Sequence, residues 1–339
     1  MILKRFVTLV LCLLLTLSLV PAMAAPAPAW AQTGDIATEG FPQLTPEGFM
    51  PEGQKEYVFI DEEAGVWRYA SQTLRVVINR TETTVEKSKL RYLTAQIFLK
   101  EGSQPFRMFA HDPAHKVEVR DAYKEKPVII ARNNNVVFSM DGDYYLYRVS
   151  RAQEVGQGYA LGVVIRDGEL LFDRPIKPGR ELYPPLDMMA LFDNGDMQVF
   201  KANEKTAQEL LDMGARDVLS FGPVLIRDGQ LGEFHKVKGA TPQPRAGMGM
   251  FAPGHYLAII AEGRIKPSAG LSTAKFAELF QSYGVTTAFN LDGGWTSAMV
   301  FMGKQLNQLD NSGVKDNARP QNEIMGIGYT ENYPDYGKK

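Results

Sequence analysis

Short apolar runs separated by polar turns dominate the chain from residue 57 onward. Such runs predict β-strands, because a strand buries its side chains over a few residues and then ends at a turn. The strands expected on this basis cover residues 74–79, 93–99, 128–131, 136–140, 256–261 and 287–289. The last of them leads directly into a polar stretch that contains two adjacent glycines.

Three Asx-Gly pairs lie between apolar runs and predict β-hairpins, because both residue types tolerate the positive φ angles of a tight hairpin turn. They lie at residues 167–168, 194–195 and 228–229. Three hairpins imply mainly antiparallel pairing. We therefore expect an α+β fold of mixed, mostly antiparallel β-sheets with a few packed helices in a single main domain.

Two segments, residues 204–213 and 272–283, repeat apolar residues at helical spacing. Ser272 has the position of an N-cap and Gly284 that of a helix stop. In both segments a glycine ends the helix, and a polar residue at a strand end follows six positions later. This weak repeat suggests that the two strands deliver their ends to one site, although helix, glycine and strand is also a common unit.

The first 24 residues have the pattern of a signal peptide. Lys4 and Arg5 precede an apolar run over residues 6–20, which is short for a membrane span, and small residues flank position 23. Residues 25–56 are rich in Pro, Ala, Gly and Thr and are interpreted as a flexible linker. We expect residues 57–332 to form the domain, residues 333–339 a tail, and the protein to be secreted or in the cell envelope, without a stable membrane span after cleavage.

Charge and composition exclude several functions. Removing the signal peptide would take away two positive charges and no acids, and would change the formal charge from −2 to −4. Nucleic-acid binding needs an excess of Lys and Arg, so no nucleic-acid partner is expected. The single cysteine, Cys12, lies in the predicted signal peptide, and the four histidines form no close pair of the kind that zinc sites use.

The stretch at residues 290–299 combines a strand-end carboxylate with a glycine turn and two hydroxyls. Asn290 and Asp292 alternate along the strand and so point to the same side. A bare backbone turn of this kind is typical of an anion-binding concavity. A tight hairpin in which Asp292 caps its own turn explains the same residues. The candidate ligand-binding residues of the stretch are Asn290, Gly293, Gly294, Trp295, Thr296 and Ser297.

Further charged residues adjoin glycine or proline at the ends of predicted segments. Each alone is more typical of a surface turn, but arginine suits two-pronged contacts with phosphate. We expect the members of this group to line one concave site, at which Asn322 is a further candidate for binding. The group consists of Asp143, Arg245, Glu262, Asp292 and Arg319.

The order of these motifs resembles the phosphodiester glycosidase family, over roughly residues 57–329. The motifs are Asp-Gly-Asp-Tyr from residue 141, Ser-Phe-Gly-Pro from 220, Pro-Arg-x-x-x-Gly from 244, Glu-Gly-Arg from 262, Gly-Leu-Ser from 270, and Asn-Leu-Asp-Gly-Gly-x-Thr-Ser-x-Met from 290. The family includes the lysosomal uncovering enzyme and bacterial proteins associated with exopolysaccharide. The resemblance implies a hydrolase that releases an N-acetylglucosamine-like sugar from its anomeric phosphodiester in a glycopolymer and leaves a phosphomonoester.

By the same resemblance, the site residues would be Asp143, Gly222, Arg245, Glu262, Arg264, Asp292, Gly293, Gly294, Thr296 and Ser297. The sequence departs from the family at four positions, where the family usually has Asn, Thr, Asp and Gly. Trp295 could narrow the pocket or stack on a sugar. The four departures are Asp141, Ala246, Glu262 and Trp295. Two of them, Ala246 and Trp295, also favour an alternative, a non-catalytic glycan- or phosphoglycan-binding protein of the same fold.

Glycoside hydrolysis normally uses two carboxyl groups, one as acid and one as base or nucleophile. A phosphodiester leaves more easily than an alkoxide, so Arg245 and Arg264 could replace the acid by stabilising the departing phosphate. Asp292 is then the candidate base or nucleophile, with Asp143 or Glu262 as its partner. This chemistry requires no cofactor. A metal-dependent phosphodiesterase that releases sugar phosphate stays a further alternative, because the oxygens of Asp141, Asp143 or Asp292 would suit Ca²⁺ or Mg²⁺.

Overall fold

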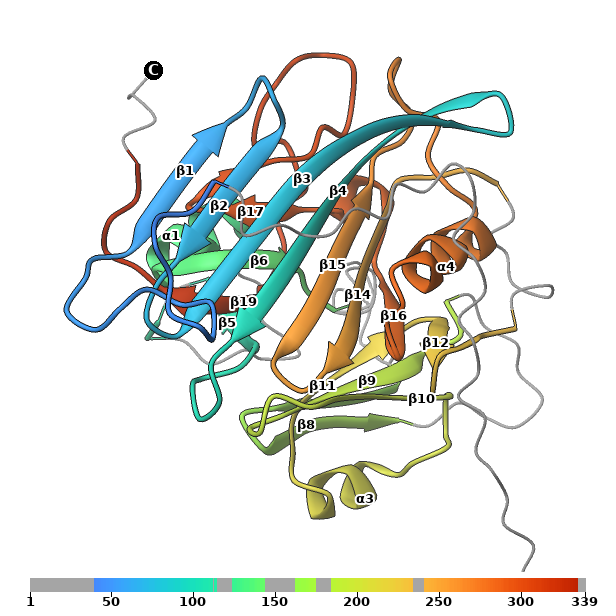
Figure 1. Cartoon of the computed structure of the whole chain (residues 1–339). Helices are drawn as coiled ribbons and strands as arrows, with labels where there is room; N and C mark the ends of the chain where they lie inside the picture. Colours follow the sequence, from blue (N-terminus) through green and yellow to red (C-terminus); the bar gives the residue numbers. More distant parts are fainter. Residues whose placement is uncertain are drawn as a thin grey trace, which may run out of the picture.

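The computed structural model describes residues 40–111, 113–114, 124–143, 162–174, 184–233 and 241–334. The predicted signal peptide, the first part of the predicted linker and residues 335–339 lie outside these ranges. The described chain folds into three antiparallel sheets that carry helices on their outer sides (Figure 1). The fold is therefore the mostly antiparallel α+β architecture that the hairpin signals predict.

The largest sheet has nine strands, and its two longest strands pair along their entire length. In spatial order it consists of β1 (Tyr57–Asp61), β2 (Val66–Ala70), β3 (Leu74–Val85), β4 (Ser88–Leu99), β15 (His255–Ala261), β14 (Arg245–Ala252), β16 (Thr287–Leu291), β12 (Val224–Arg227) and β13 (Gln230–Leu231). Expected strands at residues 74–79, 93–99, 256–261 and 287–289 fall within it and are confirmed.

Two five-stranded sheets complete the fold. The second sheet consists of β10 (Met197–Phe200), β9 (Asp187–Phe192), β11 (Ala215–Phe221), β7 (Gly162–Arg166) and β8 (Glu169–Arg174). The third consists of β18 (Lys304–Gln305), β17 (Met299–Phe301), β6 (Val136–Asp141), β19 (Glu323–Tyr329) and β5 (Arg107–Ala110). The three predicted hairpins are confirmed as β7–β8, β9–β10 and β12–β13.

The main hydrophobic core lies where the three sheets face one another. Ile260 of the large sheet, Leu219 of the second sheet and Met140 of the third belong to one cluster of buried side chains. Burying a side chain of this size contributes roughly 1.5–3 kcal/mol, so a core shared among the sheets fixes their relative positions. Because the sheets are fixed by this core, the strand ends next to it are also held at fixed positions.

The two predicted helices are confirmed. Helix α4 (Thr273–Ser282) covers the outer face of the large sheet through Phe276 and Phe280, and the hydroxyl of Ser272 accepts a hydrogen bond from the amide of Lys275 at 3.2 Å (Figure 1). Helix α3 (Ala207–Asp212) begins with a capping box and packs on the second sheet. The N-cap groups explain where both helices start.

The predicted strand at residues 128–131 is wrong, because the structure has helix α1 (Pro127–Asn133) there. A short apolar run does not by itself distinguish a strand from a buried helix. Pro127 at the first helical turn is the signal that favours the helix. Val128 and Ile130 then pack against Val300 and Ile324 of the third sheet, and this burial outweighs the β-propensity of the run.

The described part of the predicted linker lies against the fold. Phe49 and Met50 are buried, and the amide of Met50 donates to the carbonyl of Ser71 at 2.9 Å. Glu56 bonds to Tyr69 of β2. Packing therefore begins before Tyr57. Among the described helices, none is long and apolar enough to cross a membrane.

Candidate functional site

Strand β16 ends in a tight turn, residues 292–297, which we call the Asp292 turn. The turn presses against the start of β14. A Cβ atom built on Gly293 would lie 2.7 Å from the carbonyl oxygen of Pro244 and 4.0 Å from the Cα of Arg245. The amide of Gly294, which has φ +64, donates to the same Pro244 carbonyl at 3.2 Å. Glycine is required at 293 because the backbones approach too closely for any side chain.

Asp292 is partly exposed, and the hydroxyl of buried Thr296 donates to its Oδ2 at 3.2 Å. Two backbone amides of the turn donate within it. Thr296 donates to the carbonyl of Gly293 at 3.2 Å, and Ser297 donates to that of Gly294 at 3.3 Å. Beside the Asp292 carboxylate, a neighbouring arginine supplies positive charge.

Arg264 lies over the turn. Its Nη1 would be 3.5 Å from a Cβ atom built on Gly294, and its Nε donates to the side-chain oxygen of Gln243 at 2.7 Å. The side chain is exposed. A guanidinium that is oriented by an amide and open to solvent can make the two-pronged contact that a phosphate accepts.

Arg245, by contrast, is only 5% exposed. Its Nε donates to the carbonyl of Leu271 at 3.0 Å on the α4 side of the sheet. The next residue, Ala246, is fully buried in the main core. Successive residues of a strand point to opposite faces, so a hydroxyl at position 246 would face the core and not the Asp292 turn.

Asp143 follows β6 and belongs to a buried charged group, which we call the Arg166 cluster (Asp143, Arg166, Asp217 and Glu323). Arg166 donates to both carboxylate oxygens of Glu323 at 2.8 and 2.6 Å and contacts Asp143 at 3.2 Å. The amide of Ser220 donates to Asp143 at 3.3 Å. Burial raises the pKa of Asp217 to about 7, against the opposing charge of Arg166. Asp143 is thus held by the fold.

A glutamine side chain joins the Arg166 cluster to the Asp292 turn. Gln321 accepts from the amide of Gly142 at 3.3 Å and donates to the carbonyl of Thr296 at 2.8 Å. Nearby, the amide of Arg319 donates to the carbonyl of Trp295 at 2.9 Å. The side chain of Arg319 is partly buried, that of Asn322 is buried and that of Trp295 is 40% exposed.

Asp141 is fully buried close to Asp292. The amide of Ala298 donates to its Oδ1 at 3.1 Å, whereas Oδ2 has no hydrogen-bond partner within the described ranges. Burial raises the pKa of Asp141 well above its usual range, the Ala298 amide opposes this shift, and the charge of Asp292 adds to it. Burial thus favours the neutral form of Asp141 beside the partly exposed carboxylate of Asp292.

Glu262 follows β15, and its carboxylate is held by partners outside the turn. It forms an ion pair with Arg91 of β4 and accepts from the amide of Gln308 at 2.6 Å. It is 1% exposed, and burial raises its pKa while Arg91 lowers it. Glu262 and Arg245 leave the large sheet on opposite faces, because Arg245 pairs with Ala261, the residue before Glu262.

The repeat of helix, glycine and strand is confirmed as a meeting of strand ends. The side-chain amide of Asn290, at the end of β16, donates to the carbonyl of Gly222 at 2.9 Å, and Gly222 directly follows β11. Gly222 has φ +81, and a Cβ atom there would lie 2.7 Å from the Cβ of Asp187. This hydrogen bond helps to join two sheets at the edge of the Asp292 turn.

The structure thus places the Arg264 side chain, the Gly222 carbonyl and the Arg319 amide beside the Asp292 turn, whereas the Glu262 carboxylate pairs with Arg91. The sequence analysis did not identify four residues that hold the candidate site residues in place. They are Arg91, Arg166, Gln321 and Glu323. Of these, only Arg166 has a local sequence signal, because it lies next to the Asp-Gly pair of a predicted hairpin. Among the described residues, no group of three or more His, Cys, Asp or Glu side chains is arranged to hold a metal ion.

Comparison with known structures supports the fold. The catalytic domain of zebrafish N-acetylglucosamine-1-phosphodiester alpha-N-acetylglucosaminidase, auto-inhibited by its pro-peptide, superposes with a TM-score of 0.59 at 15% identity, over 77% of this chain and 85% of that one. A hypothetical protein from Synechocystis gives a TM-score of 0.55 at 12% identity, over 76% and 62% of the two chains. At these identities the likeness shows a shared fold.

Sequence comparison identifies the family. The chain is 30% identical over 157 residues to the uncharacterized protein YomE, derived from the SPbeta prophage of Bacillus subtilis (strain 168). The match covers 45% of this chain and 24% of YomE, so the chain spans about a quarter of that relative. Residues 128–327, more than half of the chain, match the phosphodiester glycosidase family. The chain therefore belongs to the phosphodiester glycosidase family.

Proposed function

We propose that the protein is a secreted hydrolase that releases an N-acetylglucosamine-like sugar from its anomeric phosphodiester in an envelope or extracellular glycopolymer. The observation that carries the proposal is Asp292, a partly exposed carboxylate fixed at the end of β16 beside the exposed guanidinium of Arg264. Membership of the phosphodiester glycosidase family supports the reaction class. Secretion is supported by the signal-peptide pattern of residues 1–24.

In the proposed reaction, the bond between the anomeric carbon and the phosphate oxygen breaks. Asp292 acts on the carbon side, either by attacking the anomeric carbon or by taking a proton from the water that attacks it. The oxygen and its electron pair leave with the phosphate as a phosphomonoester, and water supplies the new hydroxyl of the sugar. Arg264 stabilises the charge that develops on the departing phosphate.

The other carboxylates have supporting roles in this scheme. Asp143 is ion-paired with Arg166, and Glu262 is ion-paired with Arg91, so both carboxylates are held in place by fixed cations. They position the ends of β6 and β15 around the turn. Burial favours the neutral form of Asp141, which limits repulsion of the charge on Asp292.

Binding without catalysis is the second candidate function, and the exposed ring of Trp295 favours it. An aromatic ring at the rim of the turn can stack on a sugar whether or not a bond is cut. The change at Ala246 gives this alternative no support, because position 246 faces the core. Product analysis separates the two functions.

The test is to incubate the protein with an N-acetylglucosamine-1-phosphodiester and identify the products. We expect free sugar and the phosphomonoester of the aglycone. Release of sugar-1-phosphate would mean that the bond on the other side of phosphorus is cut, as a metal-dependent phosphodiesterase does. Binding without either product would establish the glycan-binding alternative.

A matched pair of variants controls the test. Asp292→Asn keeps the shape of the side chain and removes its charge at the turn. Asp228→Asn makes the same chemical change in the exposed β12–β13 hairpin, where Asn also suits the left-handed φ of +52. Only the first variant should lose activity, and loss in both would show that the assay reports general damage.

A further inference from the structure

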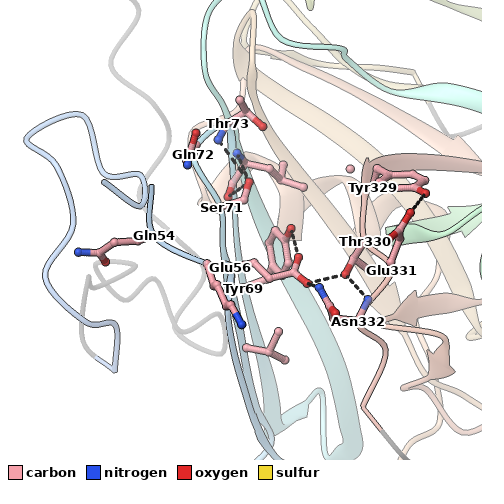
Figure 2. Close-up of a pocket in the computed structure, with 14 residues that line it drawn as sticks. Gln54, Glu56, Tyr69, Ser71, Gln72, Thr73, Tyr329, Thr330, Glu331 and Asn332 are labelled. Atoms are coloured by element: carbon pink, nitrogen blue, oxygen red, sulfur yellow. Dashed lines mark hydrogen bonds between the residues drawn. The ribbon is translucent and has the colours of Figure 1, made fainter. Parts of the chain in front are cut away.

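A cavity lies away from the Asp292 turn, where the edge of the large sheet meets the end of β19. This surface pocket, which we call the β19 pocket, has a volume of about 920 Å³ (Figure 2). Small-molecule sites range over roughly 300–1,000 Å³, so the pocket can accept more than a single small group. It is lined by residues 54–56, Val58, Tyr69, residues 71–74 and residues 328–332.

The wall of the pocket is fixed by hydrogen bonds. One carboxylate oxygen of Glu56 accepts from the hydroxyl of Tyr69 at 2.7 Å, and the other accepts from Thr330 at 2.6 Å and Asn332 at 2.8 Å (Figure 2). Burial raises the pKa of Tyr69, so its hydroxyl stays protonated and keeps donating. Glu56 thus ties the segment before β1 to the segment after β19, and the pocket is formed without a ligand.

The chemistry of the lining favours an uncharged, hydroxyl-rich ligand. Six of the fourteen lining residues carry neutral amide or aliphatic hydroxyl groups, which both donate and accept hydrogen bonds. Lys55 is the one cation among the lining residues, against Glu56 and Glu331, so an anion such as phosphate finds little attraction. The neutral polar side chains are Gln54, Ser71, Gln72, Thr73, Thr330 and Asn332.

One exposed aromatic ring completes the pocket. Tyr329 is 60% exposed, and its hydroxyl donates to Glu331 at 2.8 Å, which orients the ring at the rim (Figure 2). A flat apolar face with a polar edge suits the faces of a sugar ring. Such a ring beside amides and hydroxyls offers both contacts that a carbohydrate needs.

The pocket is separate from the Asp292 turn. Strand β19 begins at Glu323, in the Arg166 cluster, and ends at Tyr329, in the pocket. Six residue steps of about 3.3 Å place the two ends about 20 Å apart. A ligand that touches both places must therefore be a chain of several sugar units.

We propose that the β19 pocket is a second carbohydrate-binding site, which holds uncharged sugar units of a glycan. The proposal that the pocket binds sugar depends only on the structure of the pocket. Its benefit to catalysis rests on the proposed function, because only a polymeric substrate would occupy the pocket while it is cleaved at Asp292.

Binding is tested by calorimetric titration of the protein with two neutral probes, a tetrasaccharide of N-acetylglucosamine and a tetrasaccharide of glucose. Neither probe contains a phosphodiester. The wild-type protein should bind at least one of them. Tyr329→Ala should weaken that binding about tenfold, and Tyr329→Phe should preserve it because the ring stays.

Two control variants test whether the probes bind in the β19 pocket. Phe59→Ala removes an aromatic side chain that is 40% exposed on β1 and does not line the pocket, so binding should be unchanged. Asp292→Asn should also leave probe binding intact. The proposal is overturned if neither probe binds, if Tyr329→Ala binds as tightly as wild type while folded by thermal melting, or if Asp292→Asn abolishes binding.

Catalysis gives a separate result. On a glycopolymer substrate, Tyr329→Ala should raise KM about tenfold, whereas on a small sugar-1-phosphodiester it should match wild type. If the wild-type protein cleaves neither substrate, the proposed function fails, and the titrations still decide whether the pocket binds glycans. If Tyr329→Ala lowers activity equally on both substrates, Tyr329 acts on the fold or on the cleavage site, and the pocket has no separate role.

Discussion

Arg166 and Arg264 both lie near the ends of strands that surround the Asp292 turn, but their environments differ. Arg166 is buried, and its guanidinium donates to Glu323, to Asp143 and to two backbone carbonyls. Arg264 is exposed and donates to the neutral side chain of Gln243. The carboxylates near these two arginines differ in the same way, because Asp143 is 5% exposed and Asp292 is partly open to solvent.

This difference separates charges that hold the fold from charges available for chemistry. A buried cation whose donors are all used cannot form new contacts with a substrate without losing old ones. An exposed guanidinium can exchange water for a phosphate at low cost. The same residue types, placed only a few strands apart, therefore serve two purposes that burial and hydrogen bonding distinguish.

Breaking the Arg166 cluster should have the largest effect. Arg166→Met leaves Asp143 and Glu323 buried without their cation and should lower the free energy of unfolding by about 3–5 kcal/mol, measured by urea denaturation. Arg227 is the matched control, because it also donates to both carboxylate oxygens of one glutamate, Glu204, at a more exposed place. Arg227→Met should cost about 1 kcal/mol or less. Equal losses would remove the distinction between the two environments.

Replacing Asp292 and replacing Asp143 should have opposite effects on activity and on stability. Asp292→Asn should reduce hydrolysis roughly 10²–10⁴-fold and change the free energy of unfolding by about 0.5 kcal/mol or less, because the side chain is partly exposed. Asp143→Asn weakens the contact with Arg166 and should lower that free energy by about 1–3 kcal/mol. The measurements are initial rates and denaturation curves on both variants. A large loss of stability in Asp292→Asn would make the turn a structural element.

Asp217 makes the stability of the cluster depend on pH. Its pKa in the folded protein is about 7, above the ordinary 3.8, so the folded chain keeps a proton that the unfolded chain releases. Stability should therefore fall as pH rises from about 4 to about 7, and then level off. Asp217→Asn removes this pH-dependent loss, so its free energy of unfolding at pH 8 should exceed that of wild type by about 2–4 kcal/mol. At pH 3 the two proteins should be equally stable.

Thermal unfolding of wild type and Asp217→Asn across this pH range is the measurement. Asp228→Asn, in an exposed hairpin turn, serves as the control and should follow the wild-type curve. A constant difference between Asp217→Asn and wild type at every pH would show that the carboxyl does not titrate in this window.

Arg264→Lys should have the smallest effect. The ammonium keeps the charge over the turn but loses the planar fork, so kcat/KM should fall by about tenfold, or roughly 1.4 kcal/mol. Stability should be unchanged because the side chain is exposed. Steady-state kinetics on a small sugar-1-phosphodiester give the answer. An unchanged kcat/KM would mean that Arg264 does not contact the phosphate.

Local signals predicted most of the fold. The Asx-Gly turns correctly identified three of the hairpins, since turn chemistry is decided by adjacent residues. Helix α1 was missed because its run of β-branched residues reads equally as a strand. The division of the strands into three sheets depends on packing across the core, which no short segment encodes.

The candidate site was predicted only as far as glycine and proline mark strand ends. Asp292 and its turn were found that way. Arg166 and Glu323 are 157 positions apart, and nothing local to either residue predicts that they meet. Glu262 shows the converse, because its place after β15 was predicted but its pairing with Arg91 was not.

The contact between Gly293 and the Pro244 carbonyl also limits which positions of the turn can be altered. Any side chain at 293 must displace the backbone before β14, so the centre of the turn cannot be changed without moving that segment. Trp295, two residues later, projects 40% exposed from the same turn. A saturation library at position 295 would therefore sample new sugar specificities on an intact scaffold, whereas one at position 293 would return only damaged proteins.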